Sequence, residues 1–366
     1  MMAQQQWTLQ PSTTATTLVG VGAGSDAAIA AAAMDGAGAV AEVYADGKWT
    51  NSKVGGGLLL DAAKSNDSTL SVVTSLLPVF VQDTTVSSDF VQAVGVGGAI
   101  TSASIFGDNE IGLVGSVLLG KKSINGVAVS TDRGKTFSAS PVPSGYTRYG
   151  SFVDSQTWVV SAGIWGDDAN STAAHEVNYN HQDLSLSARL RAGKGGKIQR
   201  VGGDEPPVND NGWLASISIT TDGGLSYQEA FRSPQGSQYY FNGVSCSGST
   251  CVAVAEGDTA SGGTMGLAFT SSDLGKTWTQ SFYSDQLFSL MAVAMTSPTT
   301  GWMAGAVHAR GMTGQFYNTE DGGQTWVLRQ TMDNCMPLDL SFSQSGLGVA
   351  SCVSSSGSTA QAALYV

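Results

Sequence analysis

Apolar residues recur along the chain in short runs of strand length, and polar turns rich in Gly, Ser, Thr and Asp separate these runs. Residues 243–246, 250–255 and 265–270 form one set of three such runs in close succession. Runs of this length, bounded by turn residues and containing Val, Phe and Thr, are typical of strands and are too short for helices. The pattern therefore predicts an all-β protein.

One turn sequence occurs four times without gaps: Ser or Thr, any residue, Asp, any residue, Gly, any residue, Thr or Ser, and an aromatic residue. The Asp can accept backbone N–H bonds across a tight turn, and the Gly can adopt a positive φ. The hydroxyl groups can satisfy the remaining polar groups, and the aromatic residue can begin the next strand by burying its ring. We call these hairpin turns the Asp turns, at residues 130–137, 220–227, 271–278 and 319–326.

The Asp turns resemble Asp-boxes, also called BNR repeats. Such repeats mark the sialidase-like β-propellers, xyloglucanase-type glycosidases, sortilin-type receptors and the propellers of photosystem II assembly factors. The resemblance implies a propeller in which the Asp-box carboxylates are structural, here Asp132, Asp222, Asp273 and Asp321. The spacing agrees, because Asp222 and Asp273 are 51 positions apart and Asp273 and Asp321 are 48, which is the length of a four-stranded blade.

The other spacings predict the number of blades. A shortened copy of the turn at residues 45–49 and a degraded copy at 87–90 continue the repeat upstream, whereas Asp132 and Asp222 are 90 positions apart. This long interval contains only one set of strand runs. We therefore interpret residues 168–211 as an insertion between the second and third strands of one blade.

The N-terminal residues 7–10 are expected to complete the C-terminal blade, whose other strands we place at 338–342, 346–353 and 362–366. Joining the two termini in one sheet closes a ring without exposed edges. We predict a single domain, residues 1–366, with seven four-stranded antiparallel blades. Eight blades would result if the insertion itself folds as a blade.

The composition excludes some classes of partner. Of the 366 residues 47 are Gly, only 13% are charged, and the net charge is −12. Phosphate binding depends on clustered Lys and Arg, so we expect no nucleic-acid partner. We also expect no membrane span, because no uncharged apolar run is long enough for a spanning helix.

The cysteines predict an oxidising environment. Cys246 and Cys251 flank a turn-like Ser-Gly-Ser-Thr segment, and Cys335 and Cys352 lie on runs that we expect to be neighbouring strands. We predict two local disulfides and a secreted protein, with four buried thiols in a cytosolic protein as the alternative. Two triplets, beginning at Asn66 and Asn170, match the acceptor sequence for N-glycosylation.

The resemblance also implies where ligands bind: on the face opposite the Asp-boxes, formed by second-to-third strand loops and by connections between blades. The insertion falls on this face, and its charged residues include His175, Glu176, His181, Arg189 and Arg191. Aromatic rings can stack on sugars while charged groups bond hydroxyls. The candidate ligand-binding residues are Arg148, Tyr149, Trp165, Asp168, Arg232, Tyr239, Tyr240, Tyr283, Asp285, His308 and Arg310.

Glu256, Asp258 and Asp167 are the candidate catalytic carboxylates, because a glycosidase needs two carboxyl groups, one of them protonated. The early Phe/Tyr-Arg-Ile-Pro motif of sialidases is missing, which argues against sialidase activity. We expect no cofactor and no metal: His175 and His181 are six positions apart and do not match the H-E-x-x-H spacing of zinc hydrolases.

Two hypotheses follow from this set. The first is a secreted propeller that binds a glycan or other small polar ligand at the face opposite the Asp turns, with or without glycosidase-like hydrolysis. The alternative is a non-catalytic scaffold that docks a protein partner on the same face and on residues 168–211. A fold shared by enzymes and scaffolds does not choose between them.

Overall fold

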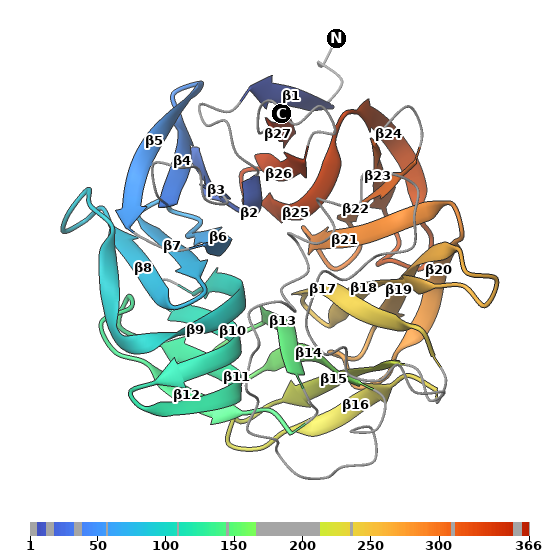
Figure 1. Cartoon of the computed structure of the whole chain (residues 1–366), viewed down its shortest axis with the longest axis horizontal. Coiled ribbons are helices and arrows are strands. Elements are labelled where there is room, and N and C mark those ends of the chain that lie inside the picture. Colours follow the sequence, from blue (N-terminus) through green and yellow to red (C-terminus); the bar gives the residue numbers. More distant parts are fainter. Residues whose placement is uncertain are drawn as a thin grey trace.

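The computed structural model describes residues 6–11, 18–32, 39–55, 58–107, 110–143, 146–165, 213–234, 237–308, 312–353 and 361–365. Within these residues it contains 27 β-strands and no helix, and neighbouring strands pair antiparallel. The sheets stand around a common centre and form a ring (Figure 1). The all-β prediction is confirmed, and the ring of sheets is the arrangement of a β-propeller.

Four of the sheets contain four strands each, in the order of the chain. The first consists of β2 (Leu18–Ala23), β3 (Ala27–Ala32), β4 (Ala39–Ala45) and β5 (Lys48–Gly55). The second consists of β13 (Tyr146–Phe152), β14 (Trp158–Trp165), β15 (Trp213–Thr220) and β16 (Gln228–Arg232). The third consists of β17 (Tyr239–Ser247), β18 (Thr250–Asp258), β19 (Thr264–Ser271) and β20 (Thr279–Ser284). The fourth consists of β21 (Leu287–Met295), β22 (Gly301–Val307), β23 (Thr313–Thr319) and β24 (Val327–Asp333).

A fifth sheet joins the two ends of the chain. It contains β25 (Met336–Phe342), β26 (Gly348–Val353), β27 (Gln361–Tyr365) and the N-terminal strand β1 (Trp7–Pro11). Trp7 pairs with Tyr365 in this sheet, and β1 and β27 lie side by side in Figure 1. The buried Trp7 ring stacks on Phe316 of the neighbouring sheet, with 4.8 Å between ring centroids. The N-terminal strand thus closes the ring, as the sequence predicted.

The sixth sheet has seven strands: β6 (Leu59–Lys64), β7 (Leu70–Ser75), β8 (Pro78–Asp83), β9 (Val91–Phe106), β10 (Glu110–Leu119), β11 (Lys122–Ser130) and β12 (Ser138–Pro141). The long strand β9 holds it together. Near its start β9 pairs with β8 through Val91, Gln92 and Gly97, and from Val96 to Phe106 it pairs with β10. β9 is therefore shared by two groups of strands, β6–β8 on one side and β10–β12 on the other.

Polar side chains connect the innermost strands of neighbouring sheets. Ser151 on β13 accepts the Cys246 N–H of β17 at 2.9 Å, and Ser245 on β17 accepts the Met295 N–H of β21 at 2.9 Å. Asn242 on β17 donates to the Leu290 carbonyl of β21 at 3.1 Å. These bonds replace the main-chain pairing that separate sheets cannot offer each other, and they fix the relative positions of the strands that line the centre.

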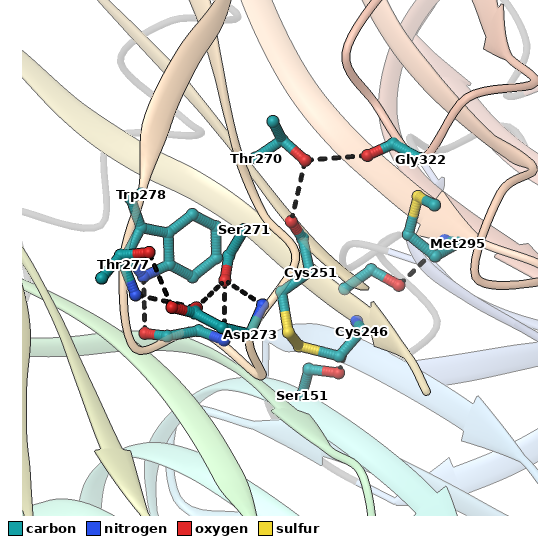
Figure 2. The surroundings of a disulfide bond; sticks show 12 residues. Ser151, Cys246, Cys251, Thr270, Ser271, Asp273, Thr277, Trp278, Met295 and Gly322 are labelled. Carbon is teal, nitrogen blue, oxygen red and sulfur yellow. Dashed lines mark hydrogen bonds between the residues drawn. A yellow bond between two sulfur atoms is a disulfide. The ribbon is translucent and has the colours of Figure 1, made fainter. Parts of the chain in front are cut away.

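All four cysteines are paired. The disulfides join Cys246 to Cys251 and Cys335 to Cys352, which confirms both predicted pairs. The first links opposite residues of β17 and β18 and lies beside the Asp turn of the same sheet (Figure 2). Within the described residues no helix is long and apolar enough to cross a membrane.

Candidate functional site

A central cavity of about 460 Å³ runs between the innermost strands. Residues of β2, β6, β9, β13, β17, β21 and β25 line it, so every sheet contributes to its wall. Polar contributions to this lining include hydroxyl groups such as Ser102 and Ser245 and two carboxyl groups, Asp61 and Asp339. We call this space the channel.

The Asp turns mark one end of the ring. In each of them the Asp carboxylate is fastened by its own turn: Asp273 Oδ1 accepts the Thr277 N–H at 2.9 Å and the Ser271 hydroxyl at 2.7 Å, and Oδ2 accepts the Thr277 hydroxyl at 2.7 Å (Figure 2). These bonds, led by that from the Thr277 hydroxyl, lower the pKa of Asp273 to about 2. Equivalent bonds hold Asp132, Asp222 and Asp321.

The same turns adopt the backbone conformation that their glycines suggested. Gly275 has φ of 78° and its N–H donates to the Ser271 hydroxyl at 2.9 Å. The preceding residue, Leu274, is also left-handed, with φ of 63°, and its N–H donates to the Ser249 carbonyl in the β17–β18 turn. The Asp turns and the turns between first and second strands therefore lie at one end, which we call the Asp-turn end. The connections between second and third strands lie at the opposite end.

A polar cluster lies near the opposite end, between the sheets that begin with β13 and β17. Tyr240 faces Glu256 across the β17–β18 pair, and its hydroxyl donates to Glu256 Oε1 at 2.5 Å. The Arg148 guanidinium reaches over from β13 and stands 4.8 Å from the Tyr240 ring centroid and 5.8 Å from that of Tyr149. Arg148 also donates to Asn242 Oδ1 at 3.4 Å. We call these five residues the Arg148 cluster.

Glu256 is only 5% exposed, and this burial raises its pKa to about 8. The Arg148 charge and the polar groups of Leu290 and Ser289 favour the ionised form, but they do not outweigh the loss of hydration. At neutral pH the carboxyl group is therefore mostly protonated. Its hydrogen bond to Tyr240 joins two strands of one sheet, β17 and β18.

A pair of carboxyl groups lies inside the channel. Asp61 on β6 accepts the Ala62 N–H at 2.8 Å and the Ala103 N–H of β9 at 2.7 Å. Asp339 on β25 accepts the Leu340 N–H at 2.7 Å and the Val21 N–H of β2 at 2.8 Å. The two carboxyl groups are close enough to influence each other's ionisation. We call them the Asp61–Asp339 pair.

Gly20 makes this pairing sterically feasible. A Cβ atom at position 20 would stand 2.3 Å from Asp61 Oδ1, closer than any side chain tolerates. Burial, reinforced by the Asp339 carboxyl, raises the pKa of Asp61 well above its usual range, while the Ala103 and Ala62 N–H groups act in the other direction. Burial also raises the pKa of Asp339. Both shifts have the same direction, because two neighbouring buried carboxylates resist being ionised together.

The sequence candidates do not all gather at one site. Arg148, Tyr149, Tyr240 and Glu256 come together, and exposed Asp258 follows Glu256 at the end of β18. Tyr239 is buried and stacks on Phe269, with 5.7 Å between ring centroids, so it belongs to the core. Its ring lies in a cluster with Phe231 and Phe241.

The remaining described candidates are spread around the rim. Arg232 lies on the outer strand β16 and forms an ion pair with Glu229 at 2.6 Å. Tyr283 on the outer strand β20 and Asp285 just beyond it are exposed. His308 stacks on Phe288, with 3.9 Å between ring centroids.

Several candidates lie outside the described residues: Asp167, Asp168, Arg310, the insertion at 168–211 and its His175, Glu176, His181, Arg189 and Arg191. Trp165 is described only as the last residue of β14. Conversely, sequence reasoning missed Asp61, Asp339 and Asn242. The available signal was a single Asp within a short apolar run, at residues 58–63 and again at 336–342.

No protein-family model and no curated protein matches the chain. Among solved structures, the fold is similar to that of YCF48 bound to a D1 peptide, with a TM-score of 0.59, 11% identity and coverage of 98% of this chain and 94% of that chain. It is also similar to U3-55K, with a TM-score of 0.63, 9% identity and coverage of 98% of both chains. At such low identity the likenesses show the fold alone, a β-propeller.

Proposed function

We propose that this protein is a non-catalytic propeller that binds a segment of a protein partner at the end of the ring opposite the Asp turns. The observation that carries the proposal is the Arg148 cluster, in which the guanidinium of a half-buried arginine is held against the faces of two tyrosine rings. Arginine and tyrosine supply much of the binding energy at protein interfaces, because both combine a large contact area with directed hydrogen bonds. A partner carboxylate is the natural match for this arginine.

The described carboxyl groups do not favour hydrolysis of a glycan. A glycosidase needs two carboxyl groups separated by roughly 5–10 Å, with the scissile bond between them. Asp61 and Asp339 instead contact each other and accept four backbone N–H groups between them. Glu256 is buried, and its Oε1 accepts the Tyr240 hydroxyl of the adjacent strand. These contacts suit carboxyl groups that hold strands in place.

The similarity to YCF48 supports the same reading, because that propeller is described in complex with a peptide. Peptide binding by this chain is a proposal that rests on its own cluster together with that similarity. We further propose that the Asp turns are Asp-boxes and that the ring has seven blades. The support for seven is that seven strands line the channel and that β9 serves as the last strand of one blade and the first of the next.

Selection from a library of displayed peptides tests the proposal, followed by measurement of the dissociation constant by calorimetry. We expect binders to carry an acidic side chain or a free carboxyl terminus, and Arg148→Ala to weaken their binding by at least tenfold. Arg232→Ala is the matched control, since Arg232 is paired with Glu229 on an outer strand. Equal losses in both variants would show that general charge, and not the cluster, attracts the peptides.

A panel of chromogenic glycosides and a glycan array address the competing hypothesis. We expect neither turnover nor binding. Turnover that disappears in Glu256→Gln would replace the scaffold with an enzyme. Glycan binding that depends on Arg148 would assign the cluster to a sugar in place of a peptide.

A further inference from the structure

The turn between β6 and β7 carries a feature that partner binding does not use. It contains the triplet Asn66-Asp67-Ser68, in which Asn66 is exposed. Asn66 also lines the mouth of the channel at the Asp-turn end. A triplet of Asn, any residue except Pro, and Ser or Thr on a surface turn is the acceptor for N-linked oligosaccharides.

The turn is held without help from the Asn66 side chain. Asp67 Oδ1 accepts the Ser65 hydroxyl at 2.5 Å and the Thr69 N–H at 3.0 Å. The Asn66 carbonyl accepts the Ser25 N–H of the adjacent turn at 2.7 Å. These contacts fix the backbone, so the side-chain amide of Asn66 stands on an ordered turn that faces solvent.

One hydrogen of the Asn66 side-chain amide is not used in its bond to Gln344. Its Oδ1 accepts the Gln344 N–H at 3.0 Å, and its Nδ2 donates one hydrogen to Gln344 Oε1 at 3.2 Å. A primary amide carries two hydrogens on nitrogen. Replacing one of them with a sugar therefore leaves the other for the bond to Gln344.

The cysteines supply an independent observation. All four are in disulfides, and both disulfides join strands of the native fold. Proteins with this pattern fold in an oxidising compartment, which in eukaryotic cells is the compartment where oligosaccharides are transferred to asparagine. A surface acceptor triplet in a protein that folds in this compartment is accessible to the enzyme that transfers the oligosaccharide.

We propose that Asn66 is a site of N-linked glycosylation at the Asp-turn end of the channel. The co-substrate is an oligosaccharide linked to a polyprenyl diphosphate. Asn66 Nδ2 forms a bond to the first carbon of the sugar, the bond from that carbon to the diphosphate oxygen breaks, the polyprenyl diphosphate leaves, and the nitrogen loses one proton. A glycan here covers one mouth of the channel and directs partners to the Arg148 cluster at the other end.

The experiment produces the full chain behind a cleavable secretion leader in a eukaryotic cell. Peptide-N-glycosidase is then applied in water enriched in heavy oxygen, which leaves a labelled Asp at each occupied position, and peptides are mapped by mass spectrometry. We expect the label at position 66, and we expect Asn66→Gln and Ser68→Ala to abolish it. A secreted, folded wild-type protein whose position 66 carries no label would overturn the proposal.

Two controls keep the result specific. Ser68→Ala retains Asn66 and its bonds to Gln344, so it separates loss of the acceptor triplet from loss of this contact. The second triplet at Asn170 provides an internal comparison, because its label is not expected to change in either variant. The proposal stands independently of peptide binding, since an unglycosylated ring can still bind a peptide and a glycosylated one can fail to.

Discussion

The ring buries carboxyl groups at two sites, and the titratable neighbour is a base at one site and an acid at the other. Glu256 lies beside the cationic Arg148, whereas Asp61 lies beside a second acid, Asp339. In both places burial is the largest cause of a raised pKa. The neighbouring charge modifies the shift, but loss of hydration decides its direction in each case.

The comparison also explains what each carboxyl group holds. Glu256 on β18 is hydrogen-bonded to Tyr240 on β17 near the end where we propose that partners bind. The Asp61–Asp339 pair connects β25, β2, β6 and β9, and so stabilises the region where the C-terminal sheet meets the first strands of the chain. Backbone N–H groups bind both members of the Asp61–Asp339 pair, whereas the observed donor to Glu256 is a tyrosine hydroxyl.

The largest effect is expected from Asp339→Ala. This change removes the acceptor for the Val21 and Leu340 N–H groups and leaves Asp61 without its partner. We expect the free energy of unfolding, measured by urea denaturation, to fall by roughly 2–5 kcal/mol. Asp339→Asn keeps one acceptor oxygen and should lose less. If the Ala variant is as stable as the wild type, the pair contributes no net stability.

Gly20→Ala tests the geometry of the same pair without removing either acid. The new methyl group would overlap Asp61, so the two carboxyl groups must move apart or β2 must shift. We expect a loss of roughly 1–3 kcal/mol in the free energy of unfolding. Gly262→Ala is a poor control because Gly262 has a positive φ, whereas Gly263→Ala meets only the Thr259 hydroxyl at 3.2 Å and should be close to neutral.

The pH dependence of stability reports on both sites. Because the folded pKa of Glu256, about 8, is higher than that of an unfolded Glu, the folded state binds the extra proton. Its contribution is complete below about pH 4 and is lost as pH rises to about 8, by at most about 1.4 kcal/mol per pH unit. Asp61 acts in the same direction.

Glu256→Gln should therefore flatten the dependence of unfolding free energy on pH between about 5 and 8, measured by urea denaturation at several pH values. Asp61→Asn should flatten it as well, with a lower stability at every pH because the amide accepts one backbone N–H fewer. A slope that neither variant changes would show that other groups cause the pH dependence.

The smallest effect is expected from Tyr240→Phe, which removes the hydroxyl that donates to Glu256. We expect a loss of about 1 kcal/mol in the free energy of unfolding. Tyr283→Phe is the matched control, because Tyr283 is 53% exposed on an outer strand. Equal effects of the two substitutions would mean that the Tyr240–Glu256 bond adds no net stability.

Local features of the fold were predictable because short segments encode them. The Asp turns and both disulfides join residues that are close in sequence, and the C-terminal strands predicted at 338–342 and 346–353 match β25 and β26 closely. The shortened and degraded copies of the Asp turn, at residues 45–49 and 87–90, were less informative about the local structure. The segment at 45–49 contains a two-residue turn in which Asp46 and Gly47 have φ of 51° and 75°. In the segment before β9, Asp83 and not Asp89 accepts the Thr85 hydroxyl and N–H.

The site was less predictable, because its residues meet through packing. Placing Tyr239 and Tyr240 on one ligand face ignored that successive residues of a strand point to opposite sides, so one entered the aromatic core and the other reached Glu256. Arg148, Tyr240 and Glu256 were candidates on one face and do lie together, but the sequence did not indicate that Glu256 is buried.

The amino-acid sequence by itself determined the all-β class, the repeating Asp turns, the disulfide pairs and the closure of the ring by the N-terminal strand, because each depends on local pattern or on a repeat. Only the tertiary structure decided that Asp61 meets Asp339 and that Arg148 meets Tyr240. Those partners are far apart in the chain and come from different sheets. No local pattern specifies such contacts, since they arise when the ring closes and brings its innermost strands around one channel.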